Sequence, residues 1–593
     1  MHNVAQLRRL RERFPDTLVV IGVHSAKFPS ERLTENIREA IIRYGIEHPV
    51  VNDAGFKVWN AYNVHAWPTI VLIDPEGRVV GGDAGEIQAE DYFPILERMI
   101  QDFEAQGLLD SQPLEIELES GFVPQTVLSY PTRICIAGDG RAYIADTRHN
   151  RIIETRLNES GGTAQILRVF GSGMPELQDG PENEAAFNAP HGMALLRNKL
   201  YVADTDNHAI RAIDLESGLV HTVAGTGGKG RSRVMGGSPR EIPLRSPWAL
   251  LALAEATEEG HDVLLIAMAG SHQIWILLDE QRLGVFAGNG REALVDGPLQ
   301  EASFNQPSDL TLGLGHLIVA DAEASAIRAI SLGDEPRVFT LVGQGLFEFG
   351  DMDGVGADVR LQHAAGITFN RQTLYIADSY NHKIKTLDPA TGRVETLAGT
   401  AEPGSSDGAF DEATFYQPEG LAYYAGKLYV ADTNNHRIRI LDLEEKTVST
   451  LILQGLDQLT GGSGESNNRQ PNRLEAVEGP PGKFTITFNL QLPEGYKLNT
   501  EAPSSLRIWD DGEARSSIEV PVEKDGTATF EVNLAGDREL NLDLTLYYCQ
   551  ESDVVLCMIH DELLVLPVRA DPMASGYVRV DYAPELPGKR MKR

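Results

Sequence analysis

The chain has 593 residues, with 52 basic and 86 acidic side chains and a formal net charge of −34. That acidity opposes binding to a phosphate backbone, so we expect no nucleic-acid partner. No apolar run is long enough to span a membrane, and three cysteines are too few for a disulfide framework. We therefore expect a cytoplasmic protein that has no membrane partner and, at this length, several domains.

Residues 1–107 alternate between helical and strand patterns, which predicts an α/β layer domain. The apolar run 18–23 is typical of a buried parallel strand, and 69–73 predicts a second strand. Helical spacing of apolar residues predicts helices over 7–14, 31–44 and 87–103.

From about 120 to 455 an internal repeat replaces the helical pattern. Its clearest copy is 429–439, which reads Tyr-Val-Ala-Asp-Thr-Asn-Asn-His-Arg-Ile-Arg. The aspartate position recurs six times at steps of 53–64 residues, and Met268 occupies it in the third copy. Six copies of this length, each with several short strands, predict a six-bladed β-propeller over 120–455.

Two polar positions recur within the repeat, an aspartate after the apolar strand and a histidine four residues later. Four histidines could suggest a metal ring on the propeller axis. A residue that nearly every copy requires normally closes a turn or bridges strands, so we interpret both positions as structural and expect no metal and no cofactor. Asn150 and Ser325 replace the histidine in two copies. The structural set is Asp146, Asp204, Asp321, Asp378, Asp432, His208, His272, His382 and His436.

The chain after the repeat changes character twice. Residues 456–482 are rich in Gly, Ser, Asn and Pro, which predicts a flexible linker. Residues 483–488 and 527–532 alternate apolar and polar side chains at period two, which predicts a C-terminal all-β sandwich over 483–585.

The motifs resemble two known families. The repeat resembles the NHL repeat, with its Ala-Asp, Asn-His and flanking Arg or Lys. Residues 1–107 resemble thioredoxin-like proteins of the TlpA type, through Ile21-Gly22-Val23, Tyr62-Asn63-Val64 and Trp67-Pro68-Thr69. In this order, with the β-rich C-terminal domain, they resemble the NHL-repeat-containing protein family.

The thioredoxin-like resemblance implies a surface at Trp67, Pro68 and Thr69. In such folds a cis proline precedes the strand and leaves the preceding backbone free to pair with an extended substrate. The alternative is a turn-forming proline beside a packed tryptophan.

The family's Cys-x-x-Cys precedes the first helix of this unit, and the sequence starts at that helix. We expect the motif and a first strand to lie upstream of Met1, the alternative being their loss in this lineage. The domain as given is therefore N-terminally incomplete and cannot carry out dithiol exchange at that site.

Cys549 and Cys557 flank a short polar segment between two predicted strands. They weakly resemble the cysteine pair in the β-domain of thiol:disulfide interchange proteins, which implies a redox or disulfide pair. Two buried free thiols are the alternative.

We expect a propeller scaffold for protein or peptide partners, coupled to the thioredoxin-like domain and acting in thiol redox homeostasis. As given we do not expect it to be an enzyme, since no catalytic motif stands in a supporting context. The alternatives are a thiol–disulfide oxidoreductase in a longer native form and a metal-dependent propeller hydrolase or lyase.

Overall fold

The fold is that of a computed structural model, which describes residues 2–111, 118, 126–230, 235–455, 472–493, 496–498, 504–510, 518–550 and 557–584. Contacts within the chain divide it into two units, Met1–Gly461 and Gly462–Arg593.

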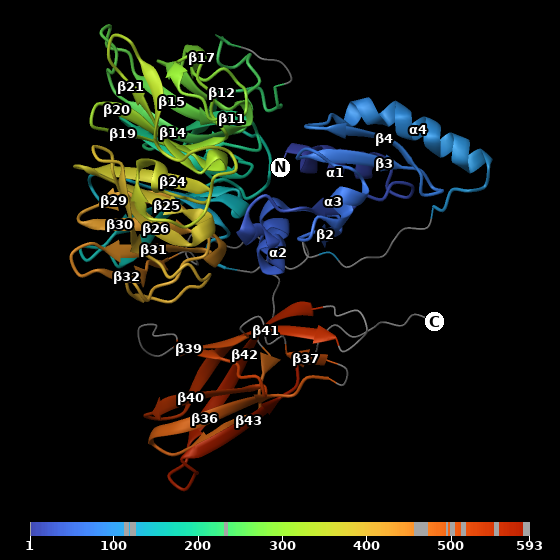
Figure 1. Ribbon diagram of the computed structural model, residues 1–593. Helices are drawn as coiled ribbons and strands as arrows, with labels where there is room; N and C mark the ends of the chain where they lie inside the picture. Colours follow the sequence, from blue (N-terminus) through green and yellow to red (C-terminus); the bar gives the residue numbers. More distant parts are fainter. Residues whose placement is uncertain are drawn as a thin grey trace. The chain divides into compact units, whose positions relative to one another are not determined.

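The first 110 residues form an α/β layer, blue in Figure 1. Its strands make two small sheets, β1 parallel to β2 and β3 antiparallel to β4. Helices α1 and α4 pack together through apolar side chains that include Leu10, Phe14 and Leu96. In chain order the elements are α1 (His2–Arg13), β1 (Gly22–His24), η1 (Pro29–Arg32), α2 (Thr34–Tyr44), β2 (Val50–Asn52), α3 (Lys57–Ala61), β3 (Thr69–Ile73), β4 (Val79–Ala84) and α4 (Ala89–Ala105).

Two sequence predictions for this layer were wrong. The helix expected over 31–44 is interrupted at Leu33, whose backbone is extended between η1 and α2. The apolar run 18–23 is not buried, because Val19, Ile21 and Val23 are 53%, 59% and 43% exposed. Among the described residues β1 pairs only with β2, so its other edge and these side chains lack a covering neighbour.

Strands between residues 126 and 455, with 231–234 left undescribed, form six small sheets of four or five strands in a propeller-like ring. The strands of each sheet are antiparallel, apart from one parallel pair in the first sheet. We number the sheets first to sixth along the chain. The first contains β5 (Pro131–Ile136), β6 (Arg141–Asp146), β7 (Arg151–Leu157) and β8 (Thr163–Phe170), with β33 (Ile452–Gln454) added; the second contains β9 (Pro190–Leu196), β10 (Lys199–Asp204), β11 (Ala209–Asp214) and β12 (Val220–Ala224); the third contains β13 (Gly236–Gly237), β14 (Pro247–Leu253), β15 (Val263–Met268), β16 (Gln273–Leu278) and β17 (Arg282–Ala287).

The other three sheets have the same order. The fourth contains β18 (Gly297–Pro298), β19 (Pro307–Gly313), β20 (His316–Asp321), β21 (Ala326–Ser331) and β22 (Arg337–Val342); the fifth contains β23 (Gly354–Val355), β24 (Ala364–Asn370), β25 (Thr373–Asp378), β26 (Lys383–Asp388) and β27 (Arg393–Ala398); the sixth contains β28 (Gly408–Ala409), β29 (Pro418–Tyr424), β30 (Lys427–Asp432), β31 (Arg437–Asp442) and β32 (Thr447–Thr450).

Neighbouring sheets of the ring share apolar cores. The inner strands β5, β9, β14, β19, β24 and β29 contact one another in sequence, and β29 contacts β5. The sixth sheet and the first share one apolar cluster, which includes Ile134, Ile144 and Ile438. β33 pairs in parallel with β8, so the last segment of the ring completes its first sheet.

The C-terminal unit has two sheets that pack over one apolar core, including Phe488, Leu542 and Leu566. Residues 472–473 and 477–479, which the sequence assigned to the linker, form strands paired with β42. The strands are β34 (Asn472–Arg473), β35 (Val477–Gly479), β36 (Gly482–Leu490), β37 (Tyr496–Leu498), β38 (Ser505–Asp510), β39 (Ile518–Pro521), β40 (Thr527–Leu534), β41 (Arg538–Gln550), β42 (Cys557–Ala570) and β43 (Tyr577–Tyr582).

Candidate functional site

The repeated histidines occupy a left-handed backbone position. It follows a three-residue turn at the end of the second long strand in each sheet, where φ is 48–54°. There the side chain of each residue accepts the backbone N–H that begins the next sheet, at 3.0–3.2 Å. The pairs are Asn150 with Ala189, His208 with Ser246, His272 with Gln306, Ser325 with His363, His382 with Gln417, and His436 with Tyr130.

Each histidine must therefore keep Nδ1 unprotonated to accept this hydrogen bond. Burial lowers the pKa of His382 to about 4 and that of His436 to about 4, from an ordinary value near 6.5. Because the folded state disfavours their protonation, both contribute stability above pH 6.5 that is lost as the pH falls towards 4.

We expect the protonation of His382 and of His436 each to lower the free energy of unfolding by about 3 kcal/mol as the pH falls from 6.5 to 4. Melting temperature measured between pH 7 and pH 4 checks this. His436→Asn is the matched variant, because Asn150 makes the same contact in the first sheet with an amide that does not titrate. Equal pH dependence of the variant and the wild type would contradict the assignment.

The repeated aspartates belong to buried ion pairs. In the second, fourth and sixth sheets the inner aspartate lies 2.8–3.1 Å from an arginine seven residues later, and both side chains are fully buried. An outer aspartate lies 2.7–2.9 Å from the same arginine. A phenylalanine ring faces each guanidinium at 5.1–5.2 Å. The sets are Asp179, Asp204, Arg211 and Phe187; Asp296, Asp321, Arg328 and Phe304; and Asp407, Asp432, Arg439 and Phe415.

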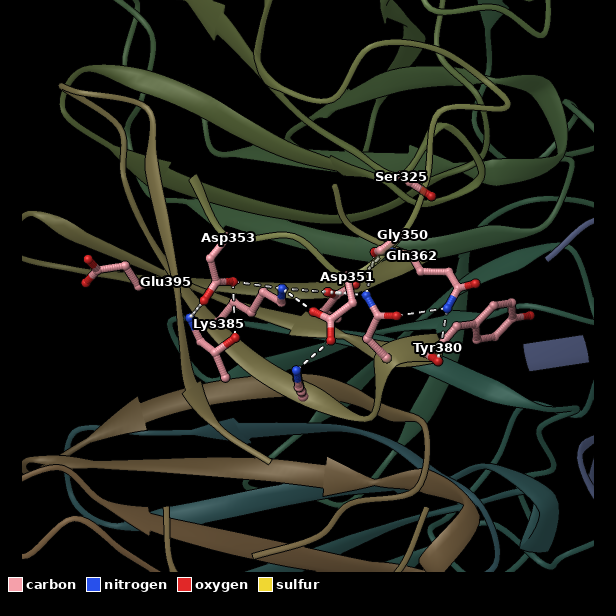
Figure 2. Close-up of polar contacts among 12 residues, drawn as sticks. Ser325, Gly350, Asp351, Asp353, Gln362, Tyr380, Lys385 and Glu395 are labelled. Atoms are coloured by element: carbon pink, nitrogen blue, oxygen red, sulfur yellow. Dashed lines mark hydrogen bonds and ion pairs between the residues drawn. The ribbon is translucent and has the colours of Figure 1, made fainter. Parts of the chain in front are cut away.

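The first and fifth sheets vary this arrangement. In the first, Asp146 pairs instead with Arg151, at 2.7 Å. In the fifth, Lys385 replaces the arginine and its Nζ lies 2.6 Å from Asp351, 3.0 Å from Asp353 and 3.6 Å from Asp378 (Figure 2). A lysine is a point charge without the bidentate fork of arginine, and here a second outer carboxylate contacts it.

In the third sheet the described residues form no such ion pair. Met268 replaces the inner aspartate and Trp275 the arginine. The strand register places Gly236 at the position of the outer aspartate. Replacing a whole buried ion pair by apolar side chains costs little, whereas losing one partner leaves an uncompensated charge. Because Met268 and Trp275 replace both charged partners, this sheet has no uncompensated buried charge at the site of the ion pair. Met268, Trp275 and the nearby Met235 also line a large cavity.

That cavity, of about 1740 Å³, lies between the α/β layer and the ring. On the layer side its lining includes Trp59, Trp67 and Pro68. The Trp67–Pro68 peptide bond is cis. The Trp67 ring packs on Trp59 at 4.4 Å, its Nε1 donates to the Ser25 carbonyl at 2.7 Å, and 47% of the residue is exposed. Thr69 begins β3 beside it.

The turn residues on this face of the ring explain where the cavity opens. In the fourth and fifth sheets the middle residue of the three-residue turn that precedes the left-handed position contacts the α/β layer. Glu323 accepts a hydrogen bond from Lys27 at 2.9 Å, and Tyr380 packs against Phe28 at 5.2 Å. The third sheet has Gly270 at this position, which leaves the cavity without a side chain there.

Helix α2 attaches the α/β layer to the ring. Arg43 is buried and forms an ion pair with the buried Glu419 of β29. Tyr130 of the ring donates to Glu39 at 2.7 Å. At another border of the cavity, Glu86 of the layer bonds to two cations of the ring, Lys229 at 2.6 Å and Arg245 at 2.9 Å.

The inner strands also carry polar residues that differ from one sheet to the next. The sequence alone did not predict these residues as a set. Arg133 donates to the Ser308 carbonyl at 2.7 Å and lies 3.5 Å from Asp309. Burial, with Arg43 and Arg133 nearby, lowers the pKa of His191 well below its usual value. Within the described residues, no three His, Cys, Asp or Glu side chains are grouped so as to hold a metal ion.

Cys549 and Cys557 are directly opposite each other in the register of β41 and β42. The connecting residues 551–556 and both side chains lie outside the described part of the structure. A disulfide or redox pair there stays a prediction.

Comparison with known proteins identifies relatives along nearly the whole chain. The NHL repeat family model matches residues 187–213 and 415–441. NHL repeat-containing protein 2 of Bos taurus is 37% identical over 96% of this chain and 85% of its own length, and that of Homo sapiens is 35% identical over 98% and 86%. Protein SUPPRESSOR OF QUENCHING 1, chloroplastic, of Arabidopsis thaliana is 35% identical over 99% of this chain, which spans 58% of that relative. In the described part of the chain, no helix has the length and apolar character needed to cross a bilayer.

Proposed function

Because the chain belongs to the NHL repeat-containing protein 2 family, we propose that it is a protein-interaction scaffold in which a six-bladed propeller and a thioredoxin-like layer together hold an extended peptide. The peptide docks in the cavity between the layer and the ring. Trp67, Pro68 and Thr69 contact its backbone, and the third sheet accepts its side chains.

One observation carries this proposal. In the third sheet Met268 and Trp275 replace the buried aspartate and arginine. Together with the nearby Met235 they line the cavity that Trp67 and Pro68 line from the other side. Methionine and tryptophan side chains adapt to varied apolar partners, which suits a peptide-binding wall. A degenerate repeat with no role in binding gives no reason for both changes to line one cavity.

We expect a peptide selected from a displayed library against the full chain to bind saturably, and to bind at least tenfold more weakly to Trp67→Ala and to Met235→Asp. Titration calorimetry measures the affinity. Met352→Asp is the matched control, because Met352, in the connection just before β23, is a methionine of similar exposure, 53% against 60% for Met235. Loss of affinity in the control, or none in the two cavity variants, would overturn the proposal.

Thiol redox homeostasis is the second part of this proposal, with the protein acting in the cytoplasm. Its support is the opposed register of Cys549 and Cys557. Alkylation followed by mass spectrometry, with and without reductant, tests the pair. If Cys549 and Cys557 still react with the alkylating reagent after oxidation, the proposed disulfide pair would be ruled out.

A further inference from the structure

One carboxylate beside the third sheet departs from the repeat. In the connections into the second, fourth and sixth sheets, one residue forms a parallel bridge to the phenylalanine that faces the buried arginine. The pairs are Pro175 with Phe187, Glu292 with Phe304, and Pro403 with Phe415. Glu292 therefore stands where the other two connections have proline, and it lines the cavity.

A row of contacts joins the wall of the third sheet to the loop that carries Glu292. Trp275 Nε1 donates to Gln273 Oε1 at 3.2 Å. The Gln273 amide in turn lies beside Gly290, where a Cβ atom would be 3.6 Å from Gln273 Nε2. All four residues line the cavity, as does Gly270, the turn position without a side chain. We call this part of the cavity, formed by Gly270, Gln273, Trp275, Gly290 and Glu292, the glutamate pocket.

The carboxylate of the glutamate pocket has no counter-ion. Glu292 forms no hydrogen bond or ion pair with the residues that the structure describes. The nearest cation, Lys27, is already paired with Glu323, at 2.9 Å. Burial and the neighbouring Glu323 raise the pKa of Glu292, and Lys27 offsets them only in part. A further cation beside Glu292 would therefore be stabilised there.

The other acidic side chains of the cavity have cations nearby. The ion pairs are Glu47 with Arg8, Glu86 with Lys229 and Arg245, and Glu323 with Lys27. The charge of Asp206 is partly offset by Arg148. Glu292 thus carries the charge that remains for a ligand to neutralise. The net charge of −34 also attracts a basic ligand in preference to an acidic one.

We propose that the glutamate pocket is a subsite for a basic side chain of the docked peptide. Glu292 pairs with the ammonium group of a lysine or the guanidinium group of an arginine, and Trp275 packs against the aliphatic part of the same side chain. The subsite rests on the proposed function and defines the class of peptide that docks there, an extended chain with a lysine or an arginine. An acidic or wholly apolar peptide would leave Glu292 covered and without a counter-ion.

Peptides selected from a displayed library against the full chain test the subsite. We expect the binders to share a lysine or an arginine at a constant position, and binders selected against Glu292→Lys to share an aspartate or a glutamate there instead. For one selected peptide, Glu292→Gln is expected to weaken binding about tenfold, as is replacing the shared basic residue by glutamine. The two changes together should weaken binding little further, because both remove the same ion pair.

Glu402→Gln is the matched control. Glu402 precedes Pro403 in the corresponding connection into the sixth sheet, and it is not among the residues that line the cavity. We expect its affinity for the peptide to equal that of the wild type. Because Glu292→Gln removes a charge next to Glu323, we also expect it to melt no lower than the wild type.

Binders without a shared basic residue, or equal affinity of the wild type and Glu292→Gln, would overturn the subsite and leave the scaffold in place. A lower melting temperature of Glu292→Gln would assign the carboxylate a structural role and would also overturn the subsite. If no library peptide binds the wild type saturably, the subsite and the scaffold both fail, so the two failures are distinguishable.

Discussion

Replacing Arg211 by methionine is expected to lower the free energy of unfolding by about 3–5 kcal/mol, because it leaves Asp204 charged and uncompensated in a fully buried site. The guanidinium also donates to the Ala186 and Gln178 carbonyls, at 2.7 and 2.6 Å, so each of these carbonyls loses one of its two donors and keeps a backbone N–H. The shift of the denaturation midpoint in urea measures the loss.

Two further variants separate the charge from the packing. Asp204→Asn with Arg211→Met removes both charges, as the third sheet does naturally, and we expect it to be more stable than Arg211→Met alone. Arg211→Lys keeps the charge but lacks the fork, and we expect an intermediate loss because Lys385 fills this position in the fifth sheet with two outer carboxylates. A double variant less stable than the single one would contradict the ion-pair account.

The repeat signal was strong enough to place the aspartate and histidine positions in the sequence, since each recurs at a fixed point of a short unit. The residues that pair with these aspartates recur less regularly, but their pattern is also present in the sequence. Arg211, Arg328 and Arg439 each follow the aspartate by seven residues, and an Asp-Gly pair recurs well before each of them. By residue type an Asp-Gly pair favours a tight turn. In the structure Asp179, Asp296 and Asp407 of these pairs also accept from the arginines.

The cavity could not be predicted, because its walls are distant in the sequence. Trp67 and Met268 are 201 residues apart, and no local pattern relates them. The sequence shows Met268 at the aspartate position, but the significance of this change depends on Trp275 replacing the arginine and on the cavity that both residues line. The burial predicted for 18–23 was wrong because, among the described residues, β1 pairs only with β2 and leaves Val19, Ile21 and Val23 exposed.

Arg43→Met is expected to release helix α2 from the ring. Arg43 and Glu419 are 376 residues apart and both buried, so the variant leaves the Glu419 carboxylate without its counter-ion at a cost of about 3–5 kcal/mol. Faster hydrogen exchange in α2, with exchange in the sheets of the ring unchanged, is the measurement. Lys27→Met is the matched control, because Lys27 and Glu323 form a more exposed ion pair of the same interface, and we expect a smaller effect.

Removing both charges decides whether the buried ion pair or the packing of α2 holds the layer. Glu419→Gln with Arg43→Met eliminates the uncompensated charge, and we expect exchange in α2 to return most of the way to the wild-type rate. Exchange as fast in the double variant as in Arg43→Met would mean that the guanidinium is needed for its packing. In either case the cavity depends on this attachment, because α2 belongs to the layer that carries Trp67 and Pro68 opposite the third sheet. A variant that frees α2 is therefore also expected to weaken peptide binding without altering any residue that lines the cavity.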